Sequence, residues 1–178
     1  MTALAGPFAI VASLLALGGA SKAVQPTDTV GALRQLGLPS SGALVRAGGV
    51  AELVIGVGAL VTGARPFAVL VAVSFAAFAA FVALALRRGA PIGSCGCFGK
   101  ADTPPSRMHV VVDVAAALVA AAVAIDPVGG ITDVVSDQPL LGLPFLLLVG
   151  VGVYLAFLTL TLLPRTLAML PSRRVRAS

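Results

Sequence analysis

Charged residues are scarce in this chain. Of its 178 residues only 11% are charged and 58% are hydrophobic, and there are just two cysteines and one histidine. Soluble globular domains carry about 25% charged residues. The composition therefore excludes a large soluble catalytic domain and predicts an integral membrane protein. Each charge that falls inside an apolar stretch is then of interest, because a charge in lipid is costly.

Long apolar runs make up most of the sequence. Stretches of about 17–25 apolar residues can cross a bilayer as helices. Five such runs are present, at about 3–24, 43–62, 66–86, 108–125 and 140–163. We expect an all-α protein with a multi-pass transmembrane domain over residues 1–163 and a basic cytoplasmic tail over 164–178. The first run should remain as an anchor, since no Lys or Arg precedes it. A short interfacial helix is expected at about 29–36.

The 12 Lys and Arg residues divide unevenly between the two sides that five spans define. With the N-terminus outside, Arg65 alone falls on the outer side. All the others fall on the inner side: Lys22, Arg34, Arg46, Arg87, Arg88, Lys100, Arg107, Arg165, Arg173, Arg174 and Arg176. Because cytoplasmic loops are enriched in Lys and Arg, we expect a plasma-membrane protein with its C-terminus in the cytoplasm. Topology and contact with the lipid bilayer explain the net charge of +5, and no nucleic-acid partner is expected.

Both cysteines lie in the tripeptide Cys95-Gly96-Cys97, which Gly93 and Gly99 flank. Two thiols separated by one residue can close a small disulfide ring, and Gly96 has no Cβ to oppose the turn. Strained disulfides are easily reduced and exchanged. The pattern favours a redox-active pair, with Cys95 and Cys97 as the catalytic residues. The alternative, two inert buried cysteines, fits poorly with glycine-rich polar surroundings.

Two carboxylates interrupt the apolar runs. Glu52 lies near the middle of the second run, and Asp113 lies in the fourth. An ionisable side chain at that depth is a candidate functional group, although Glu52 could equally act as a structural pin that hydrogen-bonds a neighbouring helix. His109 precedes Asp113 by four residues, so the two share a helix face and could relay protons. The alternative for His109 is a solvated position at the membrane interface.

Basic residues accompany the thiols on the predicted inner side. Lys22, Arg46 and Arg107 are the supporting candidates there, because cationic neighbours favour the reactive thiolate over the thiol. Topology alone would also put them on that side. No metal site is expected: a closed zinc site needs four ligands, and only His109 and Asp102 lie near the cysteines.

The order of these features resembles the MauE family of methylamine-utilisation proteins, which belongs with the DoxX-like four-helix membrane proteins. The likeness covers about residues 3–125: a helix with Lys22 near its end, a glycine-rich helix with Arg46 and Glu52, and a third helix that leads into the cysteines. It implies a DoxX-like four-helix transmembrane bundle, to which this chain adds a fifth C-terminal transmembrane helix. It also implies a redox-associated role beside thioredoxin-like partners, in the maturation of methylamine dehydrogenase or another client enzyme that needs disulfides.

These observations favour a membrane thiol–disulfide redox component, with an oxidoreductase activity left open. A single cysteine pair cannot carry electrons across a bilayer, so the chain needs a quinone among its helices, a partner with its own cysteines, or movement of the loop. The predicted inner location also conflicts with disulfide formation in exported proteins, since cytosolic reductants keep thiols reduced. Two alternatives remain: handling of a soft metal such as Cu(I) by the two thiolates, and a non-catalytic membrane assembly subunit.

Overall fold

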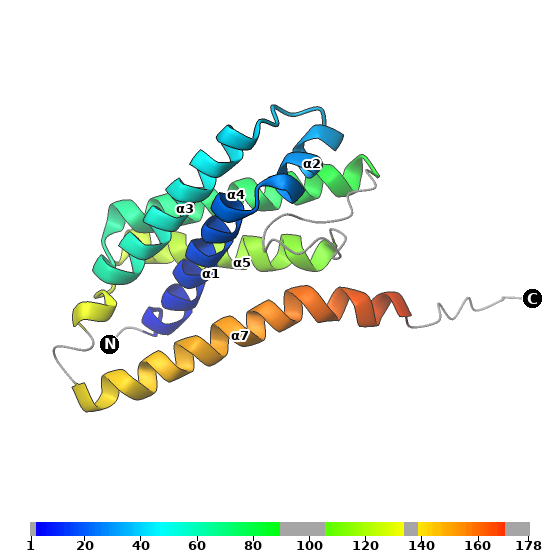
Figure 1. The fold of residues 1–178 in the computed structure, drawn as a ribbon. Helices are drawn as coiled ribbons and strands as arrows, with labels where there is room; N and C mark the ends of the chain where they lie inside the picture. The colour runs from blue at the N-terminus through cyan, green and yellow to red at the C-terminus, as the bar shows by residue number, and fades with distance from the viewer. Residues whose placement is uncertain (1–2, 90–105, 134–138, 170–178) are drawn as a thin grey trace, which may run out of the picture.

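The computed structural model describes residues 3–89, 106–133 and 139–169, and in this part of the chain it contains helices and no strand (Figure 1). The helices are α1 (Ala5–Val24), α2 (Thr27–Gln35), α3 (Gly42–Thr62), α4 (Arg65–Arg87), α5 (Arg107–Ile125) and α7 (Pro139–Met169). All but α2 are long and apolar enough to cross a membrane. The predicted all-α, multi-pass membrane class is confirmed.

Local sequence signals set the ends of α3 and α4. The Ser41 hydroxyl caps α3 by accepting a hydrogen bond from the backbone N–H of Leu44 at 3.1 Å. Gly63 ends the helix in the left-handed conformation, with φ at 59°, which a residue with a side chain rarely adopts. Pro66 then lies in the first turn of α4, where its missing N–H costs no helical hydrogen bond. The result is a tight turn between two antiparallel helices.

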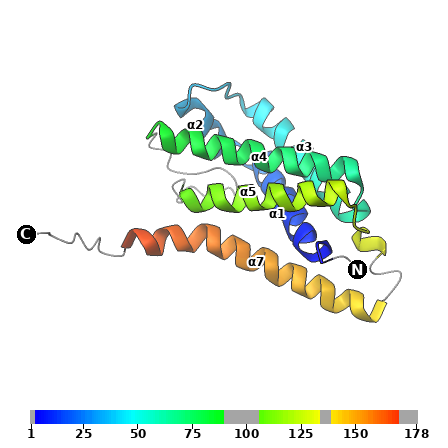
Figure 2. The ribbon, with the colours of Figure 1, turned by 180° about the vertical axis from the view of Figure 1, so that it is seen from behind.

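Helix α1 lies at the centre of the bundle and packs most closely on α3 (Figures 1 and 2). Glycines make this approach possible. A methyl group added at Gly49 would lie 2.7 Å from the backbone nitrogen of Ala23, and one added at Gly56 would lie 2.7 Å from the backbone oxygen of Ala12. Real side chains do not tolerate such distances, so the two backbones meet directly at these positions.

Helices α4 and α5 form the second closely packed pair. Buried side chains of both helices, among them Val71, Phe75, Ala120 and Val123, join those of α1 in one apolar core. The guanidinium of Arg65 donates a hydrogen bond of 3.1 Å to the last backbone oxygen of α5, that of Ile125. This contact joins the start of α4 to the end of α5, so the two helices run antiparallel.

The opposite end of the bundle is covered by α2. Its buried Ala32 and the following Leu36 pack against Ala85 near the end of α4. Arg88 donates a hydrogen bond of 2.8 Å to the backbone oxygen of Leu36. A short helix was expected at 29–36, and α2 occupies nearly that segment; its location at a membrane interface stays a prediction.

Helix α7 crosses the outside of the bundle and contacts mainly α1 (Figure 2). Gly152 provides the closest approach, against the Ile10 side chain. The helix continues to Met169, past the expected end at residue 163, so the first residues assigned to a tail are helical. The expected end was set by hydropathy alone, whereas Arg165, Leu167 and Ala168 are good helix formers that can extend a helix beyond its apolar part. The remaining residues, 170–178, lie outside the described part of the chain.

Adjacent glycines on α3 offer a matched test of the α1–α3 contact. Gly49 faces α1, whereas a methyl group at Gly48 would meet nothing within 4 Å. We expect Gly49→Ala to destabilise the bundle by about 1–3 kcal/mol, the usual cost of overpacking. Gly48→Ala should leave stability unchanged or raise it slightly, because alanine is the better helix former. Thermal unfolding of the two variants in one detergent measures the difference, and equal midpoints would contradict this packing.

Candidate functional site

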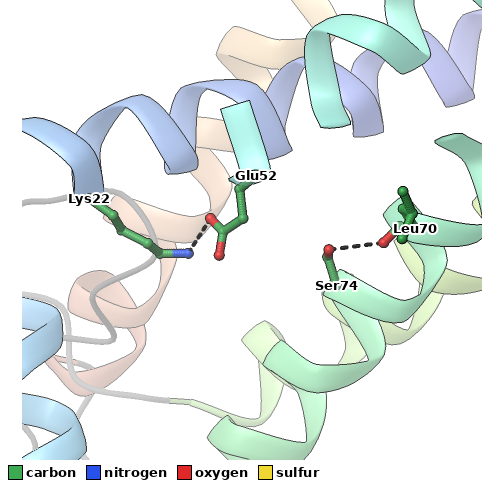
Figure 3. A network of polar contacts seen from close by, with 4 residues as sticks. All are labelled: Lys22, Glu52, Leu70 and Ser74. Carbon is green, nitrogen blue, oxygen red and sulfur yellow. Dashed lines mark hydrogen bonds and ion pairs between the residues drawn. The ribbon is translucent and has the colours of Figure 1, made fainter. Parts of the chain in front are cut away.

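A buried ion pair joins the first and third helices. The ammonium nitrogen of Lys22, in the last turn of α1, lies 2.7 Å from Oε2 of Glu52 on α3. The two side chains are only 8% and 16% exposed. Figure 3 shows them extended toward one another from the two helices, while Ser74 of α4 donates its hydroxyl hydrogen to the Leu70 oxygen of its own helix. The predicted membrane-embedded carboxylate therefore has a specific partner, thirty residues earlier in the chain.

The glycine contact described above positions this pair. Gly19 precedes Lys22 by three residues, and Gly49 precedes Glu52 by three, so on each helix the glycine and the charge share one face. A methyl group at Gly19 would lie 2.5 Å from the backbone oxygen of Gly49 and 2.8 Å from Cβ of Glu52. Close backbone approach at the glycines thus brings the charged side chains within hydrogen-bond range. This Gly-x-x-charge pattern, present in both helices, was the sequence signal that could have identified the pair.

An aromatic ring from a third helix completes the surroundings of the ammonium group. Lys22 Nζ lies 4.1 Å from the ring centroid of Phe78 on α4. The negative face of an aromatic ring attracts a cation, more strongly when water is excluded. Phe78 also packs edge-on against Phe75, with the ring centroids 5.7 Å apart. Lys22 is therefore held both by a carboxylate on α3 and by an aromatic face on α4.

Helix α5 adds a second buried carboxylate. Asp113 is 8% exposed, and its Oδ2 has no hydrogen-bond partner among the described residues. The bundle therefore holds two carboxylates, of which Glu52 has the ammonium group of Lys22 as its partner. An unpartnered carboxyl oxygen in such a place is costly, which makes Asp113 a candidate functional group rather than a packing residue.

The proton relay expected between His109 and Asp113 stays a prediction, and the structure shows where the two side chains lie. His109 is 5% exposed, so it is buried and not solvated at an interface. Its Nδ1 lies 2.9 Å from the hydroxyl of Ser106, the residue that precedes α5. No hydrogen bond between His109 and Asp113 is present in the described residues, although the two side chains share a helix face. The sequence reasoning did not include Ser106.

The remaining predicted residues do not join this cluster. Arg46 and Arg107 are exposed, and neither forms an ion pair within the described part of the chain. Cys95 and Cys97 lie outside the described residues. Helix α4 ends at Arg87 and α5 begins at Arg107, so the segment that contains the cysteines leaves and re-enters the bundle at the end where α2 lies.

A cavity of about 290 Å³ lies beside the ion pair. Lys22, Glu52 and Thr29 provide its polar wall. The rest of the lining is apolar and comes from α2, α3 and α4: Leu33, Leu44, Val45, Gly48, Gly49, Ala77, Phe78 and Phe81. Such a cavity, apolar with a few convergent polar groups, is the usual form of a small-molecule site.

The buried Lys22–Glu52 pair predicts an order of stabilities. We expect Lys22→Met to be the most destabilising change, because it leaves the Glu52 carboxylate without its cation; breaking a buried pair costs about 3–5 kcal/mol. Glu52→Leu should be milder, since Lys22 keeps its contact with the Phe78 ring. Glu52→Gln should be milder again, because the amide keeps an oxygen acceptor.

Thermal unfolding in detergent, together with the protein level in membranes, measures this order. Arg46→Met is the control, since it removes an exposed cation from α3. If Lys22→Met proved no worse than Arg46→Met, the buried pair would contribute nothing to stability.

Comparison with known proteins agrees with this architecture. Searches of curated proteins and of solved structures gave no match to the chain, so the expected DoxX-like fold likeness stays a prediction. The family model described as methylamine utilisation protein MauE matches residues 1–126, which include α1 to α5 and end before α7. The ion pair, Asp113 and both cysteines all fall in the matched part. This chain belongs to the MauE family of membrane proteins involved in methylamine utilisation.

Proposed function

We propose that this protein is a membrane thiol–disulfide redox component, with Cys95 and Cys97 as the exchanging pair. One observation supports this most: both cysteines fall in the sequence between α4 and α5, and buried ionisable side chains lie near the end of α1, at Lys22, and near the start of α5, at His109 and Asp113. Membership of the MauE family over the same residues adds to it. This function also gives the buried ionisable groups a role, because thiol oxidation releases protons that neighbouring groups can accept.

The exchange proceeds through a mixed disulfide. The thiolate of one cysteine attacks a sulfur of the partner's disulfide and expels the partner's second thiolate. The other cysteine of the pair then attacks this mixed bond, which closes the Cys95–Cys97 disulfide and releases the reduced partner. Two electrons pass from the pair to the partner in this direction, and the reverse sequence returns them. The partner is a thioredoxin-like protein, which can pass the exchange on to a client enzyme that needs disulfides.

Thiol chemistry at this pair predicts that Cys95→Ser and Cys97→Ser each abolish the exchange. Both variants should reach the membrane at normal levels, because neither cysteine falls in one of the five apolar runs of the sequence. Thiol trapping with mass spectrometry should detect a reversible disulfide in the wild-type protein. Full complementation of a deletion strain by both variants would contradict the proposal. Copper bound to both cysteines, with no disulfide between them under any condition, would instead support the metal-handling alternative.

We further propose that the protein resides in the plasma membrane, with its N-terminus outside and the cysteine segment in the cytoplasm. The uneven distribution of Lys and Arg supports this orientation. In this orientation the cysteine pair meets cytosolic thioredoxin-like partners and not exported ones.

A membrane-impermeant maleimide tests the orientation. In intact cells the reagent should not label Cys95 and Cys97 of the wild-type protein. It should label the Pro127→Cys variant, which is made in a background without the native cysteines. Pro127 is exposed just beyond α5, at the opposite end of the bundle. Permeabilised and reduced cells are the control, in which all three thiols should react. Labelling of the native pair in intact cells would reverse the orientation.

A further inference from the structure

We propose that the cavity beside Lys22 and Glu52 binds the ring of a lipid-soluble quinone. The inference rests on the proposed redox function and supplies what that function lacks, a two-electron acceptor within the membrane. The site consists only of described residues, from α1, α2, α3 and α4. Its volume of about 290 Å³ is at the lower end of small-molecule pockets, which suits a single ring with its tail outside.

The cavity is open toward the surrounding membrane. Helix α3 packs mainly on α1, and α4 mainly on α5, so the seam between α3 and α4 is the less tightly packed one. Leu44, Gly48 and Ala77 line the cavity and are also exposed on the outside of the bundle. Both helices are long and apolar enough to span the membrane. A ligand dissolved in the lipid can therefore enter sideways between α3 and α4.

The lining favours a flat, neutral molecule with a hydrogen-bond acceptor. Phe78 and Phe81 offer aromatic surfaces on one wall, and Gly48 and Gly49 leave the facing wall without side chains. The Lys22 ammonium has three donor hydrogens and uses one on Glu52. A quinone carbonyl can accept another.

Charged ligands fit this site less well. An anionic phosphate headgroup would face the carboxylate of Glu52, which lines the cavity and is paired with its one lysine among the described residues. A cationic ligand would have to displace Lys22 from the face of Phe78, which the lysine already occupies. A neutral ring with a carbonyl group meets neither objection.

The redox step balances with this ligand. The Cys95–Cys97 dithiol loses two electrons and two protons and becomes a disulfide, while the quinone gains both and becomes a quinol. The S–S bond forms as the two S–H bonds break, and the two quinone oxygens become hydroxyls. Lys22 can donate a proton toward a carbonyl oxygen as the ring becomes reduced, and Glu52 holds the lysine in place across their 2.7 Å contact. Of the two protons that the dithiol releases, one restores the Lys22 ammonium group and the other forms the second hydroxyl.

Direct binding to the purified full chain in nanodiscs tests the site. The probe is a benzoquinone that carries a photoreactive azide and a short isoprenoid tail, with crosslinked peptides mapped by mass spectrometry. We expect crosslinks on α3 and α4 around the cavity, and competition by unlabelled quinone. Gly48→Leu should fill the cavity and so weaken quinone binding about tenfold or more. A loss of this size corresponds to the usual cost of overpacking, about 1–3 kcal/mol.

Gly42→Leu is the matched control, because Gly42 lies on the same helix, has nothing within 4 Å of its added methyl position and does not line the cavity. Phe78→Leu is a second variant, which keeps bulk but removes the aromatic face and should also weaken binding. Equal binding by Gly48→Leu and Gly42→Leu would overturn the proposal. So would crosslinks confined to α7, or competition by phospholipid alone.

The cysteine variants separate this inference from the proposed function. Quinone binding should survive in the Cys95→Ser/Cys97→Ser double variant, since residues of α1, α2, α3 and α4 line the cavity and remain unchanged. Bound quinone without any oxidation of the wild-type cysteine pair would refute the thiol–disulfide function and leave the site intact. Oxidation of the pair by a thioredoxin-like partner, with no quinone bound, would refute the site and leave the function intact.

Discussion

The direct contact between the backbones of α1 and α3 is the constraint on which the rest of the structure depends. Two helices can approach this closely only where side chains are missing from the contact, as at Gly19, Gly49 and Gly56. The approach at Gly19 and Gly49 places Lys22 and Glu52, one turn further along each helix, within 2.7 Å of each other. Two charges can remain in a membrane protein's interior only when such pairing offsets part of their desolvation cost.

The same contact leaves space on the other side of α3. Because α3 is drawn onto α1, and α4 is paired with α5, the seam between α3 and α4 is left open enough to hold a cavity. Lys22 forms part of the wall of that cavity and also lies over the Phe78 ring of α4. The same lysine therefore joins α1 to α3 and α4 and provides the cavity with its cationic group.

The buried ion pair, Asp113 and the cysteines all belong to the same part of the chain. The family match ends at residue 126 and so contains the cluster and the cysteines but not α7. Helix α7 contacts the bundle mainly through α1 and leaves much of its surface exposed, as Tyr154 and Leu147 illustrate. The apolar surface fits a helix that faces lipid, while the first five helices hold the groups to which we assign function.

The sequence by itself determined the membrane class, the number of long apolar helices and the unusual nature of Glu52, Asp113 and the cysteine pair, because hydropathy and the cost of charge in lipid are local properties. Only the tertiary structure decided which charges meet. Arg46 is nearer to Glu52 in sequence than Lys22, yet it points outward, because the glycine face of α3 turns toward α1. The cavity likewise arises from helix pairing, a relation between distant segments that no single stretch of sequence contains.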